Sequence, residues 1–453
     1  MRNVDIVKVF KDPKLVGQEI SVEGWVKFNR DSGRIVFIAM NDGTTINNLQ
    51  IVCKPDNLKN FDKVASFRLA SAIKAKGLLK PGREPGSVEL EAKEVKLLKL
   101  ADEDYPLQNK EHSNEFLREI AHLKSRATST QAIMRVRTEL AYAIHHFFHT
   151  KGFMYMASPL ITSNDCEGAG ENFIIQDDPT NPFFGGVKAG LTVSGQLNAE
   201  AYALGMKKVY TFGPTFRAER SHTNRHLAEF WMVEPEVNFM NFRQLTVLIE
   251  QMFKHIVAYV LKRCENEIKF LNKKYNNNTF ETLSQLIQQK FVRLDYSKAV
   301  DILKEAVAAG HKFEDSNIFW GKDFGAEHER YLCEKYFKAP VFLCNFPKEI
   351  KAFYMKQNSD GKTVAAGDLL VPGVGEIVGG SQREDNYEKI VKRCQEMNID
   401  TKGLQWYLDL RKYGYFRSAG YGLGFERMLM YITGVDNIRD TIPFARFNGE
   451  LKF

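Results

Sequence analysis

The run from Val209 to Glu236, VYTFGPTFRAERSHTNRHLAEFWMVEPE, holds the side chains best suited to chemistry. Two apolar strands joined by a basic loop are predicted, and such a loop suits the binding of polyphosphate. Arg217 and Glu219 end the first strand, and Phe230 opens the second. The basic residues of the loop include Arg220, Arg225 and His226. A guanidinium, a carboxylate and an aromatic ring are therefore predicted to converge on one nucleotide.

A glycine-rich segment, Gly420–Gly424, precedes an apolar helix predicted to start near Phe425. Glycine allows the backbone to approach a flat ligand closely, and the helix start directs Glu426 and Arg427 at the same place. The spacing differs from the dinucleotide fingerprint, and the chain has no G-x-x-x-x-G-K-[ST] motif. The sequence therefore supports neither a Rossmann nor a P-loop nucleotide site.

The first hundred residues provide one kind of supporting element. Short alternating apolar and polar runs are separated by turn signals such as Asn41-Asp42-Gly43. The pattern predicts five strands and one helix, which is the make-up of an OB-fold barrel. We place this barrel domain in residues 1–105 and a linker or hinge in the charged stretch that follows, residues 106–128.

Residues 129–453 predict a second domain of the α+β class. An amphipathic helix covers residues 133–147 and ends at Gly152, and strands dominate from 207 to 239. Residues 244–345 are interpreted as a mostly helical insertion. Because strands and helices do not alternate regularly, an antiparallel sheet flanked by helices is predicted rather than a parallel one.

Composition sets the broad class. The chain has 453 residues, 44% of them hydrophobic, and a net charge of +7, which permits a polyanionic partner without demonstrating one. Its six cysteines form no C-x-x-C pair, so free thiols and a reducing cytoplasm are expected. No apolar run approaches the ~20 residues of a membrane span, and the N-terminus lacks a signal-peptide pattern.

Several motifs resemble a known family. FRAERSHTNRHLAEF and GLGFER resemble the second and third signature motifs of class II aminoacyl-tRNA synthetases. The helix that ends at Gly152-Phe153, with the segment that continues to Pro159, resembles the first. In that family the first motif forms a dimer interface, and the other two build an ATP site on an antiparallel sheet. An N-terminal OB-fold is similar to the aspartate, asparagine and lysine subgroup, in which the barrel binds the anticodon.

Four further segments resemble the asparaginyl branch of this subgroup. They are SGQLNAE, HLAEFWMVEPE, LLVPGVGEIVGGSQRE and GVDNIRDTIPF. Aspartyl enzymes place a lysine where this chain has Ala199, and a substrate carboxylate buried without that partner costs several kcal/mol. The resemblance thus implies ATP- and Mg²⁺-dependent attachment of L-asparagine to tRNA(Asn) by a homodimer. The alternatives are an aspartyl or non-discriminating synthetase, a paralogue that makes asparagine, and a non-catalytic RNA-binding protein.

The resemblance also implies roles for single residues. Arg217 and Arg427 would be catalytic. The implied ATP-binding residues are Arg217, Arg225, His226, Phe230, Gly422, Gly424 and Arg427. Glu376 and Asp368 would hold Mg²⁺. Glu167 and Gln196 would bind the α-amino group of asparagine, Arg383 its side-chain carbonyl oxygen and Glu219 its amide hydrogens. The implied anticodon-binding residues are Arg30, Phe37 and Gln50.

Two segments depart from the family pattern. Arg417 and Ser418 stand where many relatives have the proline and histidine of a Val-Pro-His run, and Ala445 stands where a proline is usual. The first departure lies next to the third motif, so it bears on the geometry of the pocket. The second concerns packing.

Overall fold

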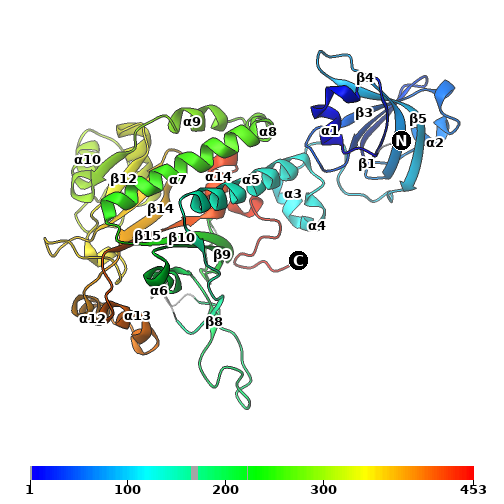
Figure 1. Cartoon of the computed structure of the whole chain (residues 1–453). Coiled ribbons are helices and arrows are strands. Elements are labelled where there is room, and N and C mark those ends of the chain that lie inside the picture. The colour runs from blue at the N-terminus through cyan, green and yellow to red at the C-terminus, as the bar shows by residue number, and fades with distance from the viewer. Residues whose placement is uncertain (1–2, 165–171, 222) are drawn as a thin grey trace. The chain divides into compact units, whose positions relative to one another are not determined.

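The computed structural model describes residues 3–164, 172–221 and 223–453. The chain divides into two compact units, Met1–Ala132 and Ile133–Phe453 (Figure 1). Among the described residues, no helix combines the length and the apolar character that crossing a membrane requires.

The first unit contains a closed barrel in which the strands follow the order β1-β2-β3-β5-β4. The strands are β1 (Glu19–Asp31), β2 (Val36–Asn41), β3 (Leu49–Cys53), β4 (Ala72–Pro81) and β5 (Val88–Lys99), and the helices are α1 (Ile6–Lys11) and α2 (Phe61–Ala65). Only β3 and β5 pair in parallel among these neighbours. The alternation seen in the sequence fits the closed barrel, since Val22, Val26 and Ile38 fill the interior.

The stretch expected as a linker carries two short helices, α3 (Asn114–Glu119) and α4 (Ala121–Lys124). The Ser113 side chain accepts a hydrogen bond from the Phe116 amide and caps α3. This stretch is therefore structured locally.

The second unit is built on an eight-stranded sheet with the order β11-β12-β13-β14-β15-β10-β9-β6. The strands are β6 (Met154–Tyr155), β9 (Lys208–Phe216), β10 (Glu229–Asn238), β11 (Val292–Asp295), β12 (Val341–Cys344), β13 (Ala366–Val371), β14 (Gly375–Gln382) and β15 (Ser418–Gly424). Pairing is antiparallel except at the two edges, where β11 with β12 and β6 with β9 run parallel. A separate pair, β7 (Ile161–Thr162) and β8 (Gly190–Leu191), lies outside this sheet.

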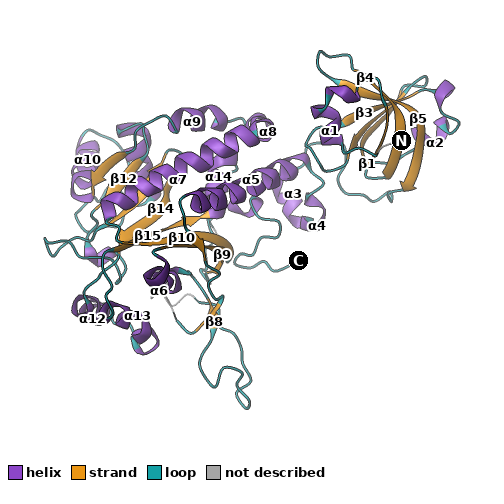
Figure 2. Ribbon diagram, in the orientation of Figure 1, coloured by secondary structure: helices purple, strands orange, loops and turns teal. Residues whose placement is uncertain are grey.

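Helices cover both faces of the sheet (Figure 2). They are α5 (Thr128–Thr150), α6 (Gln196–Met206), α7 (Phe242–Arg263), α8 (Glu265–Tyr275), α9 (Thr279–Leu286), α10 (Tyr296–Ala308), α11 (Ala326–Arg330), α12 (Tyr387–Glu396), α13 (Gln405–Asp409) and α14 (Phe425–Thr433), and a π-helical turn covers Tyr331–Tyr336. Helix α6 packs on β9 and β10, whereas α7 packs on β14 and β15. The predicted OB-fold and α+β class are both confirmed.

Residues 244–345 contain most of α7, then α8 to α11, together with β11 and β12. Helix α7 begins with a capping box, in which Asn241 and Gln244 exchange side-chain and backbone hydrogen bonds. Since β11 and β12 extend the main sheet at one edge, this region shares the sheet with the strands of the site.

Candidate active site

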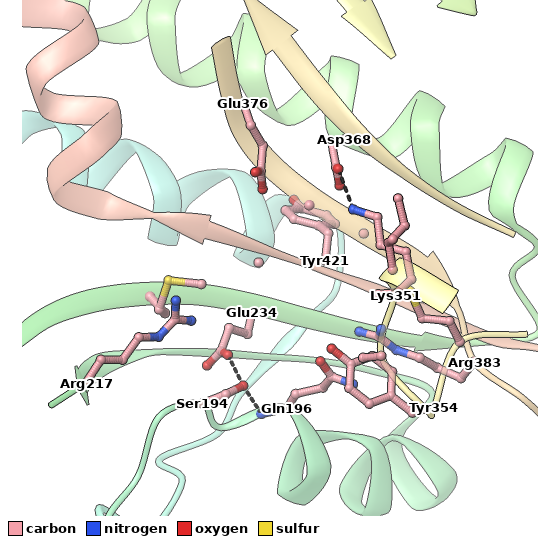
Figure 3. A pocket seen from close by; sticks show the side chains of 17 residues that line it. Ser194, Gln196, Arg217, Glu234, Lys351, Tyr354, Asp368, Glu376, Arg383 and Tyr421 are labelled. Carbon is pink, nitrogen blue, oxygen red and sulfur yellow. Dashed lines mark hydrogen bonds and ion pairs between the residues drawn. The ribbon is translucent and has the colours of Figure 1, made fainter. Parts of the chain in front are cut away.

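A cavity of about 310 Å³ opens on the sheet of the second unit (Figure 3). Its lining comes from β10, β13, β14 and β15, from the start of α6 and from the loop between β12 and β13. The lining residues are Ser194, Gln196, Arg217, Met232, Glu234, Ile350, Lys351, Ala352, Tyr354, Met355, Asp368, Glu376, Gly379, Gly380, Arg383, Tyr421 and Gly422. This volume is enough for a small ligand, and the lining carries charges of both signs.

The β9–β10 hairpin holds Arg217 at one side of the cavity. Phe230 pairs with Thr215 in the ladder, and Arg217 donates its backbone N–H to Ala228 O at 3.0 Å. The Arg217 guanidinium lies 5.3 Å from the centre of the Phe230 ring. Its Nε is buried and has no hydrogen-bond partner among the described residues. A buried, unpaired donor is costly, so this nitrogen is suited to an anionic ligand oxygen.

Further guanidinium groups gather beside the turn between β13 and β14. Arg225 donates from Nη1 to Val374 O at 3.0 Å, and Arg427 donates from Nη1 to Glu376 O at 3.4 Å. Burial lowers the pKa of Arg225, and the nearby cations Arg427 and Arg330 lower it further. This concentration of positive charge fits a polyphosphate.

His226 is fixed by several neighbours on the same loop. Its Nδ1 lies 3.0 Å from Ser221 Oγ and contacts Thr223 Oγ1, and its Nε2 lies 3.4 Å from Glu219 Oε2. Glu219 also lies 3.9 Å from the Arg217 guanidinium. Glu219 is therefore a partner of two basic side chains, and it is not part of the cavity lining.

Two carboxylates meet across Gly379. Asp368 pairs with Gly379 in the ladder, and a Cβ on Gly379 would lie 3.2 Å from both Asp368 Oδ1 and Glu376 Oε1. Asp368 Oδ2 binds Lys351 Nζ at 2.7 Å. Burial raises the pKa of Asp368 to about 6, and the negative charge of Glu376 adds to the shift, while Lys351 opposes it.

These carboxylates fit a magnesium site of the kind shared with a nucleotide. Mg²⁺ is bound by one or two carboxylates together with phosphate oxygens and waters. Glu376 and the Oδ1 oxygen of Asp368 supply the carboxylate oxygens, and Gly379 leaves room between them. Lys351 binds the other oxygen of Asp368, Oδ2, so Glu376 is the better placed of the two carboxylates to bind Mg²⁺.

The opposite end of the cavity carries Gln196, Tyr354 and Arg383 (Figure 3). Nearby, the Glu234 carboxylate accepts hydrogen bonds from Ser194 Oγ, from Gly195 N at 2.9 Å and from Thr211 Oγ1 at 3.0 Å. These donors hold the carboxylate in place at the cavity wall, where a positively charged ligand group would be stabilised.

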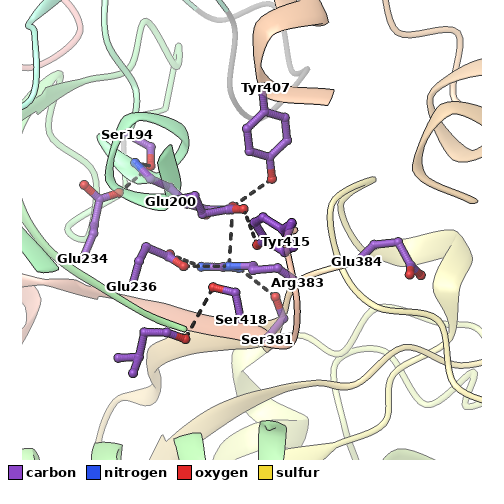
Figure 4. Close-up of polar contacts among 12 residues, drawn as sticks. Ser194, Glu200, Glu234, Glu236, Ser381, Arg383, Glu384, Tyr407, Tyr415 and Ser418 are labelled. Carbon is purple, nitrogen blue, oxygen red and sulfur yellow. Dashed lines mark hydrogen bonds and ion pairs between the residues drawn. The ribbon is translucent and has the colours of Figure 1, made fainter. Parts of the chain in front are cut away.

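Arg383 is buried between two carboxylates (Figure 4). Its Nε donates to Glu236 Oε2 at 3.1 Å and its Nη2 to Glu236 Oε1, while Nη1 donates to Ser381 Oγ at 2.7 Å. Glu200 Oε1 lies 3.7 Å from Nε. Gly420 makes room for Glu236, because a Cβ there would lie 2.1 Å from Glu236 Oε1. Burial raises the pKa of Glu236, and the Arg383 guanidinium opposes that shift.

The geometry has counterparts among known proteins. The family model for class II tRNA synthetases (D, K and N) matches residues 113–448, and the OB-fold nucleic acid binding domain model matches residues 20–98. An asparagine–tRNA ligase of Malacoplasma penetrans is 52% identical over 455 residues, covering 100% of both chains. The chain belongs to the asparagine–tRNA ligases of class II.

Solved structures of this family agree. The asparaginyl-tRNA synthetase of Pyrococcus horikoshii complexed with asparaginyl-adenylate is 32% identical, with a TM-score of 0.88 over 99% of both chains. The complex of the Entamoeba histolytica enzyme with asparaginyl-adenylate is 26% identical, with a TM-score of 0.85 over 99% of this chain and 98% of that one.

Most residues singled out in the sequence lie around the cavity. Gln196, Arg217, Asp368, Glu376, Arg383 and Gly422 line it. Phe230 and Arg427 contact the lining residues Arg217 and Glu376, and Gly424 pairs with Met232 of the lining. Arg225 binds Val374 in the turn that precedes Glu376. Glu167 lies outside the described residues. Ala199 is buried against Ala203, Val209 and Met156 and is not part of the lining.

Several residues that line the cavity or bind its lining residues were not found in the sequence. Glu234 and Glu236 had a signal, since two carboxylates at alternate positions of an otherwise apolar strand share one face. Lys351 and Tyr354 come from an irregular loop that sequence patterns do not place. Glu329 was hidden in the region interpreted as an insertion; its carboxylate accepts the Glu376 amide at 2.9 Å, and burial, with Glu376 close by, raises its pKa to about 7.

On the barrel, Arg30, Phe37 and Gln50 lie on the outer surface of adjacent strands. Arg30 pairs with Phe37, and Ala39 pairs with Gln50. Gln50 Nε2 donates to Glu89 Oε2 at 3.0 Å. The neighbouring Phe28 is 38% exposed on the same strand as Arg30. Aromatic and polar side chains thus share one face of the barrel, as base-stacking surfaces do.

Proposed function

We propose that the chain activates L-asparagine with ATP and transfers it to the 3′-terminal adenosine of tRNA(Asn). The observation that carries this proposal is the buried pair of Arg383, which lines the end of the cavity, and Glu236, which accepts its hydrogen bonds. A side-chain amide presents both an acceptor and donors. Arg383 supplies donors and Glu236 an acceptor, so the pair matches an amide on both sides.

Glu236 replaces Glu219 as the acceptor for the amide hydrogens. Glu219 is engaged with Arg217 and His226, whereas Glu236 accepts hydrogen bonds from Arg383, a guanidinium that lines the cavity and would bind the substrate amide. Two carboxylates, Glu200 and Glu236, balance the guanidiniums of Arg383 and Arg411. Aspartate would add an uncompensated buried charge to this balanced set, which disfavours it.

The α-amino group of asparagine is assigned to the wall formed by Gln196 and Glu234. An ammonium is stabilised by a carboxylate, and Glu234 is held towards the cavity by three donors. Glu167 remains a candidate from the sequence for the same group. The carboxylate of asparagine then lies towards Arg217.

The nucleotide is assigned to the other side of the cavity. Phe230 stacks on adenine, Arg217 binds the α-phosphate, and Arg225, His226 and Arg427 bind the outer phosphates. Gly422 and Gly424 allow the backbone of β15 to lie close to the nucleotide. Glu376, with Asp368, would hold Mg²⁺, which neutralises phosphate charge when it is bound.

The chemistry has two steps. The asparagine carboxylate attacks the α-phosphorus, pyrophosphate leaves, and asparaginyl-adenylate forms. The 3′-hydroxyl of tRNA then attacks the activated carbonyl and AMP leaves. Arg217 stabilises the negative charge that develops on the α-phosphoryl group, and the cavity orients the two reactants, so catalysis rests on positioning and electrostatics.

The remaining assignments concern partners and compartment. Arg30, Phe37 and Gln50 bind the anticodon, the chain acts as a homodimer, and it works in the cytoplasm. The dimer assignment is supported by exposed apolar side chains beside the first motif, including Tyr142, Met154 and Tyr155, which are 55%, 54% and 53% exposed.

Amino-acid-dependent pyrophosphate exchange tests the proposal. Exchange with asparagine, and none with aspartate or lysine, is expected. Arg217→Ala should abolish exchange while tRNA binding persists, because the barrel carries the anticodon site. Exchange with aspartate would move the assignment to the aspartyl branch, and silence with all three amino acids would favour a non-catalytic RNA-binding protein.

A further inference from the structure

Behind the amino-acid end of the cavity, Glu200 is fully buried and surrounded by donors (Figure 4). Its carboxylate accepts hydrogen bonds from the Tyr407 hydroxyl at 2.8 Å, the Tyr415 hydroxyl at 2.8 Å and Arg411 Nη2 at 3.1 Å. Gln196 Nε2 donates at 3.2 Å. Glu200 therefore joins α6 to two segments that are distant in sequence.

The same segments hold the backbone around Arg383. Ser418 O accepts the Arg383 amide at 2.7 Å, and Arg411 Nε donates to Glu384 O at 3.0 Å. Tyr415 belongs to the segment in which this chain departs from related sequences, and its hydroxyl also interacts with the side chain of Ser418, which is small and fully buried. The segment that departs from related sequences therefore also contains Tyr415, whose hydroxyl binds Glu200.

Arg383 has a limited number of donors. Three of its N–H groups already donate, two to Glu236 and one to Ser381. A guanidinium has five N–H groups, so about two remain for a substrate. Glu200 Oε1 is already 3.7 Å from Arg383 Nε. A buried carboxylate that loses a hydrogen-bond donor needs another. Arg411 already binds Glu200 through Oε2, and Arg383 is the second cation within 4 Å of Glu200 among the described residues, on the side of Oε1.

We propose that Tyr407 and Tyr415 are positioning residues for amino-acid selection. By donating to Glu200 they keep its carboxylate from competing for the N–H groups of Arg383, which then bind the side-chain amide of the substrate. Burial raises the pKa of both tyrosines well above the usual value, so both hydroxyls keep their protons across the working range of pH. The inference rests on the proposed function, and it says which residues hold the asparagine-binding side chains in place.

Tyr415→Phe and Tyr407→Phe in the full chain test the inference by pyrophosphate exchange. Each should raise the KM for asparagine roughly tenfold or more, the size expected for a hydrogen bond to a charged group, and leave the KM for ATP and the melting temperature nearly unchanged. Tyr431→Phe is the matched control, since the Tyr431 hydroxyl is buried and has no hydrogen-bond partner among the described residues.

An unchanged KM for asparagine in both variants would overturn the inference. So would a parallel rise in both KM values with a lower melting temperature, which indicates a general structural role, or an equal effect in Tyr431→Phe. A wild-type chain that shows no exchange with asparagine would reject the proposed function itself, whereas normal wild-type exchange with normal variants would reject the inference alone.

Discussion

At the scale of single residues, selection of the amino acid rests on charges that are buried in pairs. Arg383 and Glu236 are exposed by only 2% and 0%. Charges buried this deeply are stable only with partners, so each fixes the other's position and cannot easily reorganise around a wrong substrate. The pair therefore acts as a rigid template for one side chain.

Glu236→Gln should weaken asparagine binding selectively. The amide offers Arg383 a neutral acceptor and faces it with an NH₂ group, so we expect a loss of about 1.5–3 kcal/mol, which is a rise in the KM for asparagine of roughly 10- to 100-fold. The KM for asparagine is measured by the kinetics of pyrophosphate exchange. Glu219→Gln is the control and should leave that KM unchanged; a larger effect at Glu219 would restore the assignment made from the sequence.

The sequence was informative about residues whose chemistry is carried by a local motif. Arg217, Glu376 and Arg383 were found because each stands in a distinctive run, and each lines the cavity. The resemblance gave Glu219 as the acceptor for the amide hydrogens, and in the structure Glu219 lies in the loop after β9, beside Arg217 and His226. Contacts between distant segments, such as Tyr415 with Glu200, leave no local pattern.

At the scale of elements, the turn between β13 and β14 links the carboxylates proposed to hold Mg²⁺ to the arginines proposed to bind phosphate. Glu329 accepts the Glu376 amide at 2.9 Å, and Glu334 accepts the Gly373 amide at 2.7 Å. Arg225 binds Val374 O from the other side. Glu334 lies in the π-helical turn and Glu329 just before it. Such turns often occur where a helix must present side chains to a functional site.

Glu329→Ala should loosen this turn and with it the Glu376 carboxylate. We expect the Mg²⁺ concentration that gives half-maximal exchange to rise about three- to tenfold, as the loss of one hydrogen bond of about 1 kcal/mol implies. A magnesium titration of the exchange reaction measures it. Glu305→Ala, an exposed glutamate on α10, should leave the titration unchanged. An unaltered Mg²⁺ requirement in Glu329→Ala would contradict this coupling.

Long elements with a regular apolar pattern were predictable. The helix expected over residues 133–147 is part of α5, and the expected strands near 207–219 and 228–239 are β9 and β10. The parallel pairings at the two edges of the sheet were not, because they join strands far apart in sequence. The place of β11 and β12 in the sheet depends on tertiary contacts, which the local sequence pattern does not reveal.

At the scale of the whole molecule, two compact units divide the work between them. The cavity lies wholly within the second unit, while Arg30, Phe37 and Gln50 belong to the barrel of the first. In the proposed function, formation of the adenylate uses only the cavity, whereas charging of tRNA uses both units. Changes on the barrel surface should therefore separate the two half-reactions.

Phe37→Ala provides that separation. Stacking of a base on an aromatic ring contributes about 1–3 kcal/mol, so the KM for tRNA in aminoacylation should rise roughly 5- to 150-fold. Because Phe37 lies on the outer face of β2, between the buried residues Val36 and Ile38, the barrel core should keep its stability. Asparagine-dependent exchange without tRNA should be unchanged.

Phe10→Ala, which removes another exposed ring of the same unit from α1, is the matched control. A lower exchange rate in Phe37→Ala would show that the barrel acts on the first step as well, and an unaltered KM for tRNA would place base stacking at other residues, with Phe28 the nearest candidate.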